Sequence, residues 1–416
     1  MLQAILDLLY LIIKINLFKS FWILKPFSKK GLSGVQGQSP ALKKGEAMFC
    51  RNICVENFRN IESANVEFCP GTNVLIGENA QGKTNLLEAI YMTALGKSFR
   101  QGSDKDVIRF GQEYCSINNG YTDDTRDMEI SMRIFSDRRA KRVEQNGLKV
   151  ARTSDMVGSF KVVLFCPEHL SIIKEGPAIR RNFLDVAISQ IRPLYMKSLQ
   201  RYATILKERN ALIKDAEENR LAFESTIDLF SEQLAQEAAI ITVYRVKYVE
   251  KLKKYVARCF ADMTGERELP ELEYISSCKL NEEECFDVNR CREAYRSLYF
   301  SHHDREIGAG ATLWGIHKDD IEINLNGNRA RIFASQGQQR SLSLALKLAE
   351  GEIIRDECGG DYPVFLFDDV LSELDSGRRK YLLSNLAGKQ VILTCCESNI
   401  KADKLISVKN GRFEEI

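Results

Sequence analysis

The pattern of hydrophobic and polar positions after residue 48 is typical of β-strands that lead into a helix. FCRNICVENFRNI and SANVEFCPGTNVLIG read as strands, with a Pro-Gly turn at 70–71 inside the second segment. After residue 83 apolar residues recur at helical spacing. Further along, Asn-Gly at 146–147 lies between β-compatible flanks with basic residues nearby, which predicts a hairpin.

The middle of the chain has a helical pattern. Between Arg181 and Gly265 there is one proline and no glycine, and apolar residues recur every three or four positions. The polar stretch DAEENR at 215–220 is the best point for a reversal of the chain. We therefore expect a helical arm of two antiparallel helices, each a few turns long, rather than a long coiled coil.

Beyond residue 308 the β pattern returns. IEINLNGNRARIF predicts a strand, an Asn-Gly turn at 326–327 and a second strand, and LSLALKLAEGEII predicts a helix. YPVFLFDD has the uninterrupted apolar run of a buried strand, and VILTCC resembles a neighbouring core strand. Strands are therefore expected at both ends of the chain, with helices between them.

Length and composition change this picture little. The 416 residues are enough for two or three domains of ~150 residues each. A content of 44% hydrophobic and 28% charged residues is typical of a soluble globular protein. The twelve cysteines stand mostly alone, and the chain has no pair of Cys-x-x-Cys units that would suggest zinc. We expect reduced cysteines and a cytoplasmic protein.

The first 47 residues differ from the rest. Their seven lysines against Asp7 and Glu46 give a charge of +5, which leaves −3 for the remainder of the chain. Charged residues interrupt the apolar run, so no membrane span of ~18 residues is expected. Lys-Lys-Gly-Glu-Ala at 43–47 can be encoded by a purine-rich ribosome-binding sequence, which favours a start at Met48 and an over-called or disordered extension. The alternative is an amphipathic extension on a membrane surface.

One segment has the pattern of a phosphate-binding loop. GENAQGKT at 77–84 follows the strand NVLI and precedes a helix, where the pattern requires it. The glycines let backbone N–H groups curl around phosphates, Lys83 neutralises the β and γ charges, and Thr84 supplies an oxygen to Mg²⁺. The predicted ATP-binding residues are Gly77, Glu78, Asn79, Ala80, Gln81, Gly82, Lys83, Thr84 and Asn85.

Two carboxylates follow the buried strand near the C-terminus. Asp368 and Asp369 come directly after the apolar run VFLF, and a buried strand delivers such residues to its carboxyl edge, beside the phosphate loop. We predict that Asp368 binds Mg²⁺ together with Thr84, and that Asp369 orients the attacking water. Lys83 and Asp369 are thus the predicted catalytic residues.

A second anion site is predicted at the start of the helix that precedes these carboxylates. Ser335, Gln336, Gly337 and Gln338 stand just before a long helix, whose free N–H groups and dipole favour an anion. Alone, this turn is an ordinary helix cap. Its place between the phosphate loop and the acidic strand is the order found in ABC-type ATPases, in which a signature turn contacts the γ-phosphate held by another subunit.

Together these segments resemble the RecF family of bacterial recombination and gap-repair proteins over essentially all of residues 48–416. The most discriminating stretch is LFCPEHLSIIKEGPAIRRNFLD at 164–185, because generic ATPases lack it together with SQGQQR. The other matching stretches are VENFRN at 55–60, IGENAQGKTNLLEAI at 76–90, GKSFR at 96–100, LKERNALIK at 206–214, FASQGQQRSLSLALKLAE at 333–350 and FLFDDVLSELD at 365–375.

The resemblance implies a function. A family member is an ATP-dependent homodimer that binds double-stranded DNA near single-strand gaps and, with the mediator proteins RecO and RecR, helps to load the recombinase RecA. Its ATPase is slow, is stimulated by DNA and works as a switch. Residues 335–338 would then act across the dimer, and residues 372–375 match a loop at the dimer interface.

The chain departs from the family pattern at two places. Residues 315–320 read Gly-Ile-His-Lys-Asp-Asp where the family usually has Gly-Pro-His-Arg-Asp-Asp. At 394–396, Thr-Cys-Cys replaces Thr-Thr-Thr, near the position where transporter-type ABC proteins carry a histidine. The missing histidine fits a slow switch rather than a rapid pump.

A local basic patch is expected to hold DNA, because the chain after residue 47 has a net charge of −3. The predicted phosphate contacts are Arg180, Arg181, Lys97 and Arg100. A solvated surface is the commoner role of such side chains. Further candidates are Arg138, Arg139, Lys141 and Arg142.

The predicted fold class is an α/β, ABC-type P-loop ATPase head built from both chain ends, with an inserted α-helical arm. The expected parts are the extension at 1–47, the head at 48–180 and 308–416, and the arm at 181–307. Two alternatives remain open. A chromosome protein of the SMC type would need a far longer arm. A P-loop kinase would not explain the signature turn, and the 47 residues after Asp369 leave no room for a nuclease domain.

Overall fold

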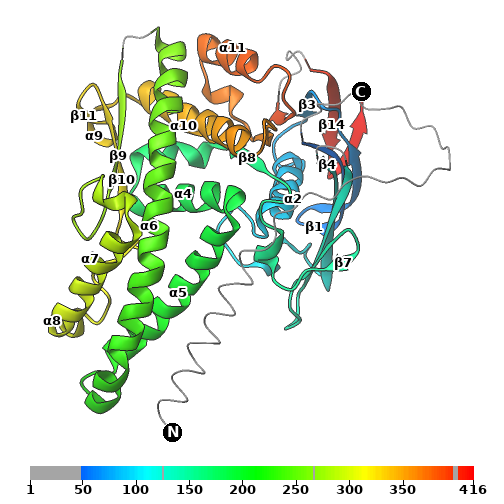
Figure 1. Ribbon diagram of the computed structural model, residues 1–416. Coiled ribbons are helices and arrows are strands. Elements are labelled where there is room, and N and C mark those ends of the chain that lie inside the picture. The colour runs from blue at the N-terminus through cyan, green and yellow to red at the C-terminus, as the bar shows by residue number, and fades with distance from the viewer. Residues whose placement is uncertain (1–47, 124–125, 266–267, 397–401) are drawn as a thin grey trace, which may run out of the picture. The chain divides into compact units, whose positions relative to one another are not determined.

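Residues 48–123, 126–265, 268–396 and 402–416 are described by the computed structural model shown in Figure 1. They fall within one unit that extends from Lys44 to Ile416. The predictions for residues 1–47 lie outside the described residues. Among the helices that are described, none combines the length and the apolar character needed to cross a bilayer.

Both ends of the chain contribute strands to one six-stranded sheet (Figure 1). The strands are β3 (Thr72–Ile76), β8 (Val162–Phe165), β12 (Val364–Phe367), β13 (Val391–Cys395), β14 (Lys404–Lys409) and β15 (Arg412–Glu415). Their order is β15-β14-β3-β13-β12-β8, and all neighbours are parallel except the pair β14 and β15. The strands predicted from YPVFLFDD and VILTCC are confirmed.

The apolar runs of these strands are explained by burial of both faces of the sheet. Alternate side chains point to opposite faces, so Leu75 and Leu366 lie in one hydrophobic cluster whereas Val74 and Phe367 lie in another. Helix α2 (Lys83–Leu95) packs in the first cluster and helix α10 (Gln336–Glu357) in the second. Both helices were predicted and are confirmed.

A second, antiparallel sheet packs in the same cluster as α2. Its strands are β1 (Phe49–Phe58), β2 (Ile61–Glu67), β4 (Tyr114–Asp123), β5 (Arg126–Phe135), β6 (Arg142–Gln145) and β7 (Leu148–Lys149), in the order β2-β1-β4-β5-β6-β7. The predicted hairpin at 146–147 is confirmed between β6 and β7. Asn146 and Gly147 have φ values of 51° and 75°, both positive as a type I′ turn requires.

The helical arm is present, with its reversal at the predicted place. Helix α4 (Pro177–Ile191) leads into α5 (Pro193–Lys214), and α6 (Arg220–Thr264) follows after a short turn. The predicted length of a few turns is wrong for α6, which has 45 residues. It continues beyond α5 because its apolar face also packs against α7 (Val288–Ser301) and α10.

A small sheet joins the helical region to the C-terminal segment. It consists of β9 (Pro270–Ile275), β10 (Asp320–Leu325) and β11 (Asn328–Arg329). The predicted second strand after Asn-Gly at 326–327 is wrong beyond Arg329, since Ala330–Phe333 form the short helix α9. An apolar run this short does not distinguish a strand from a helical turn. The domain boundaries at 180 and 307 stay predictions.

The remaining elements are short. They are the helices α3 (Ser171–Lys174), α8 (His303–Ala309) and α11 (Ser376–Asn385), and the 3-10 turns η1 (Asp104–Val107), η2 (Thr153–Met156), η3 (Pro167–Leu170), η4 (Glu284–Phe286) and η5 (Leu371–Glu373).

Two ion pairs of the helical arm differ in their burial. The side chains of Arg209 and Glu306 are 0% and 1% exposed and lie 2.6 Å apart. On α6 the side chains of Arg220 and Glu224 are 55% and 57% exposed, and their charged groups lie 2.7 Å apart. A buried charge that loses its partner is costly, whereas an exposed pair contributes little.

We expect Arg209→Met to lower the free energy of unfolding by about 3–5 kcal/mol, because it leaves Glu306 buried without its cation. The matched substitution Arg220→Met, in a pair exposed on both sides, should lower it by less than about 1 kcal/mol. Guanidinium chloride unfolding, followed by circular dichroism, measures both. Equal losses in the two variants would contradict this account of the arm.

Candidate nucleotide site

The phosphate loop lies between β3 and the N-terminus of α2, as the sequence predicts. Gly82 has a left-handed φ of 113°, and a Cβ there would lie 3.0 Å from the side-chain oxygen of Asn60. A Cβ at Gly77 would lie 2.3 Å from the backbone oxygen of Val408. Both positions therefore favour glycine, and the loop ends at the start of a 13-residue helix whose first N–H groups suit an anion.

Lys83 is folded over this loop. Its Nζ donates hydrogen bonds to the backbone oxygens of Gly77 and Glu78, the second at 3.0 Å. Cys396 Sγ lies 3.5 Å from the same nitrogen. Lys83 is 8% exposed, and among the described residues its Nζ has these neutral partners and no ion pair. The amine is thus placed for phosphate groups that enter the loop.

Asp368 follows β12 and meets the phosphate loop through Thr84. The Thr84 hydroxyl donates to Asp368 Oδ1 at 2.7 Å, and the Thr394 hydroxyl donates to the same oxygen at 3.0 Å. Burial raises the pKa of Asp368 above its usual value, against the effect of these two hydrogen bonds. Hydroxyl and carboxylate oxygens are the ligands that Mg²⁺ takes in proteins, so Thr84 and Asp368 fit the predicted metal.

Asp369 turns the chain away from the sheet. Its φ of 51° is left-handed, a conformation that a non-glycine residue adopts only with support. Its N–H donates to Thr394 Oγ1 at 2.9 Å, and the Ser372 hydroxyl donates to its backbone oxygen at 2.7 Å and to its Oδ1 at 3.1 Å. Asp369 is exposed beside the buried Asp368, which is where a water-orienting carboxylate is needed.

The predicted signature turn forms an exposed start to α10. The Ser335 hydroxyl accepts a hydrogen bond from the Gln338 N–H at 3.3 Å, and Gln338 Oε1 accepts one from the Ser335 N–H at 2.7 Å. Ser335 and Gln336 are both exposed. Within the part of the chain that the structure describes, no hydrogen bond or ion pair joins residues 335–338 to residues 77–85.

Helix α10, just after the signature turn, is instead tied to the segment that follows Asp369. Arg340 pairs with Glu373 at 2.6 Å. Arg378 donates to the Ser341 hydroxyl at 2.6 Å and pairs with Asp375. The structure therefore brings Lys83, Thr84 and the two aspartates to one edge of the sheet. It ties the first turns of α10, next to residues 335–338, to residues 373–378, and Ser372 bonds Asp369 between the two sets.

One of the predicted DNA contacts is corrected by the structure. Arg180 is 6% exposed, and its guanidinium pairs with Asp320 at 2.8 Å. It also donates to the backbone oxygens of Ile172 and Glu175, at 3.3 and 2.7 Å. Since all three of its guanidinium nitrogens are bonded to protein, Arg180 has the contacts of a structural cation and not of a DNA contact.

The other three candidates differ in their exposure. Arg181 donates to the backbone oxygen of Asp319 at 2.8 Å. Arg100 lies 3.3 Å from Glu88 and is half-buried. Lys97 is exposed, so it has the surface that a DNA contact requires.

Residues without a predicted role in nucleotide binding support the phosphate loop and α2. Glu88 is fully buried, and Arg59 lies 2.7 Å and Arg100 3.3 Å from its carboxylate. Asn60 donates to the backbone oxygen of Ala80 in the phosphate loop at 3.0 Å. The sequence contains evidence for Arg59, Asn60 and Arg100, because the stretches VENFRN and GKSFR match the family although they lie outside the phosphate loop. Thr394 is not among the predicted site residues. Its position near the end of β13, the strand beside β12, is the feature of the sequence that could have indicated it.

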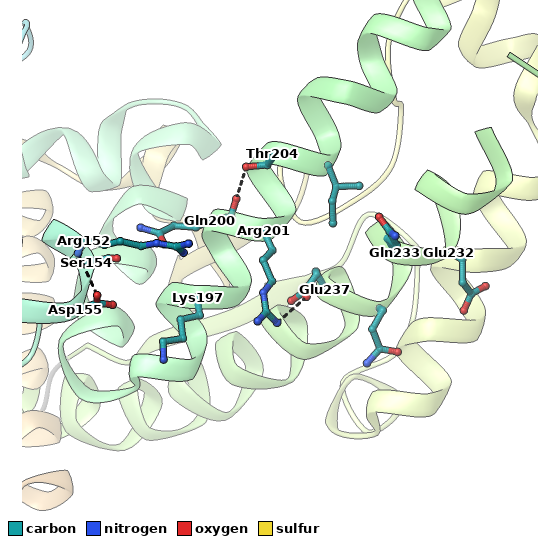
Figure 2. Close-up of a pocket in the computed structure, with 12 residues that line it drawn as sticks. Arg152, Ser154, Asp155, Lys197, Gln200, Arg201, Thr204, Glu232, Gln233 and Glu237 are labelled. Carbon is teal, nitrogen blue, oxygen red and sulfur yellow. Dashed lines mark hydrogen bonds and ion pairs between the residues drawn. The ribbon is translucent and has the colours of Figure 1, made fainter. Parts of the chain in front are cut away.

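A separate pocket of about 880 Å³ lies between residues 152–155 and the helices α5 and α6 (Figure 2). Figure 2 shows Arg201 turned toward Glu237. The charged residues of its lining are Arg152, Lys197, Arg201, Asp155, Glu232 and Glu237. Because cations and carboxylates balance, the pocket lacks the positive charge of a phosphate site, and none of the predicted nucleotide residues lines it.

Comparison with known sequences agrees with the geometry. Residues 49–414 match the sequence model of the family described as RecF/RecN/SMC N terminal domain. The DNA replication and repair protein RecF of Geobacillus sp. (strain WCH70) is 38% identical over 342 residues, 82% of this chain and 90% of the relative. The protein of that name from Clostridium perfringens (strain SM101 / Type A) is 38% identical over 376 residues, 88% of this chain and 100% of the relative.

Comparison with solved structures confirms the predicted fold class. A structure described as the recombination mediator protein RecF with ATP in the RecFOR pathway has a TM-score of 0.82 and 35% identity, covering 89% of this chain and 99% of that one. The Smc head domain from Pyrococcus furiosus, 18% identical with a TM-score of 0.52 over 89% of this chain and 96% of that one, supports the fold alone.

We expect Lys83→Met to weaken ATP binding by ~100-fold or more, because a charge-assisted hydrogen bond to phosphate contributes up to ~3 kcal/mol. The control is Lys97→Met, which removes an exposed lysine of the same region and should leave ATP affinity unchanged. Titration with a fluorescent ATP analogue measures both. Equal ATP affinities of Lys83→Met and the unsubstituted protein would refute the assignment of this loop.

Proposed function

The chain belongs to the RecF family and is therefore an ATP-binding protein of DNA replication and repair, and from this premise we propose that it acts as an ATP-driven dimeric switch on DNA. The observation that carries the proposal is a half-complete site. Lys83, Thr84, Asp368 and Asp369 converge, whereas the signature turn at 335–338 is exposed and has its own set of contacts.

ATP and Mg²⁺ are assigned to the converged half. The loop N–H groups and Lys83 would hold the phosphates, and Thr84 with Asp368 would hold the metal, which neutralises charge on the β- and γ-phosphates. Asp369 would orient the attacking water, since its carboxylate is exposed beside Asp368. These roles follow from residue chemistry together with the geometry of the edge of the sheet.

A second copy of the chain would supply the missing half. Gln336 and Gly337 lie in the first turn of the 22-residue helix α10, and their N–H groups, which have no partner among the described residues, suit the γ-phosphate bound to a partner. The Ser335 and Gln338 N–H groups are taken by the capping box. Residues 372–375 would lie at the same interface, because Arg340 and Arg378 fix them to α10. ATP would then favour the dimer by binding both subunits, and hydrolysis would release it.

Double-stranded DNA near single-strand gaps is the proposed partner of the dimer, with RecO and RecR as proposed protein partners in the cytoplasm. Support comes from relatives named DNA replication and repair protein RecF and from the structure described as part of the RecFOR pathway. Lys97 is the proposed DNA contact, because its side chain is exposed. A slow, DNA-stimulated ATPase fits this role better than a rapid pump.

We expect Ser335→Arg to keep ATP binding but to lose ATP-induced dimerisation, because the bulky cation enters the interface and not the subunit's own phosphate loop. Ser225→Arg, on the exposed surface of α6, is the matched control and should dimerise normally. Sedimentation velocity with and without ATP gives the oligomeric state. A Ser335→Arg protein that still dimerises with ATP would defeat the cross-subunit site.

The class of activity is tested by ATP turnover with and without duplex DNA. A DNA switch should hydrolyse ATP slowly, and several-fold faster with duplex or gapped DNA. A P-loop kinase would instead need a small-molecule acceptor, so the same assay is run with such acceptors in place of DNA. Turnover that depends on an acceptor and ignores DNA would reject the proposed function.

A further inference from the structure

Thr394 lies in the mostly parallel sheet between the strand that leads to the phosphate loop and the strand that leads to Asp368. β13 is the strand between β3, which leads to the phosphate loop, and β12, which leads to Asp368. In the parallel register Thr394 is opposite Leu75 of β3, and the preceding Leu393 is opposite Phe367 of β12. Thr394 is therefore level with Asp368, one strand away.

The hydroxyl of Thr394 serves both aspartates at once. It donates its proton to Asp368 Oδ1 at 3.0 Å and accepts a hydrogen bond from the Asp369 N–H at 2.9 Å. Thr394 is 2% exposed, so water does not substitute for these bonds. One buried hydroxyl thus fixes the orientation of a carboxylate and the backbone of the residue that follows it.

The two hydrogen bonds of Thr394 have different effects on the site. Asp369 has a φ of 51°, which is unfavourable for a non-glycine residue, and its N–H bond to Thr394 supports that conformation. Thr84 also bonds Asp368 Oδ1, but it belongs to the phosphate loop and has an assigned role toward the metal. Thr394 holds the same oxygen from β13, independently of the loop.

We propose that Thr394 is a positioning residue that fixes Asp368 for the metal and Asp369 for water through its single hydroxyl. This inference rests on the proposed ATPase function of the site. The hydroxyl is bonded to Asp368 Oδ1 and to the Asp369 N–H, so its effect is exerted through the two aspartates. Its loss should leave the phosphate loop, and hence metal-free ATP binding, intact.

The test compares Thr394→Val, which keeps the shape and removes the hydroxyl, with Thr394→Ser, which keeps the hydroxyl and removes the methyl. Thr394→Ala is a second hydroxyl-free variant in case valine disturbs packing. Thr93→Val is the matched control, because Thr93 is also buried and its hydroxyl also donates one bond and accepts another, at 2.7 and 2.8 Å.

Calorimetry with ATP in EDTA and with ATP in Mg²⁺ gives the first readout. In the hydroxyl-free variants we expect the affinity for ATP in EDTA to be unchanged. The increase in ATP affinity on addition of Mg²⁺ should be 10- to 100-fold smaller than in the unsubstituted protein, which is the usual effect of losing a hydrogen-bond partner of a metal ligand. The second readout is ATP turnover, with a fall in kcat rather than a rise in KM. Thr394→Ser should restore both.

The inference is wrong if the hydroxyl-free variants match the unsubstituted protein, if serine fails to rescue, or if Thr93→Val shows the same Mg²⁺ defect. Failure of the proposed function looks different. In that case the unsubstituted protein itself would not hydrolyse ATP, while the comparison of ATP binding with and without Mg²⁺ would still decide the role of Thr394.

Discussion

The parallel alignment of β3, β13 and β12 is the constraint on which the rest of the structure depends. Parallel strands end at the same edge of a sheet, so the residues that follow β3 and β12 meet there although they are far apart in sequence. The hydrogen bond from Thr84 to Asp368, at 2.7 Å, spans 284 residues. Between those residues the chain forms β8 and β12 of the same sheet, most of the second sheet and the helical arm.

The family-specific stretches are explained by two buried sets of contacts. Arg59 and Arg100 converge on Glu88 behind the phosphate loop. The stretch at 164–185 meets residues 315–320 and α6 through Arg180 with Asp320 and Arg245 with Asp185, both at 2.8 Å. Ile316, which stands where the family usually has proline, takes part in this set through its backbone. Its backbone oxygen accepts a hydrogen bond from Arg245 at 2.7 Å, so this contact does not depend on the side chain that departs from the family pattern.

Features with a local physical cause could be predicted from the sequence. The phosphate loop, the Asn-Gly turn at 146–147 and the buried strand VFLF are each fixed by backbone conformation or by continuous burial. Features that depend on distant packing could not. The length of α6 depends on α7 and α10, and the burial of Arg180 depends on Asp320, which lies 140 residues away. Thr394 acquires its role only once β13 lies between β3 and β12.

A site divided between subunits is the central claim, and mixing two inactive variants tests it most directly. Lys83→Met lacks the phosphate half and Ser335→Arg lacks the signature half, so a mixed dimer contains one site in which both halves are intact. We predict that DNA-stimulated ATP turnover, absent from either variant alone, returns when the two are mixed in equal amounts. No turnover in a mixture of two folded variants in which sedimentation with ATP shows that the mixed dimer has formed would contradict the claim.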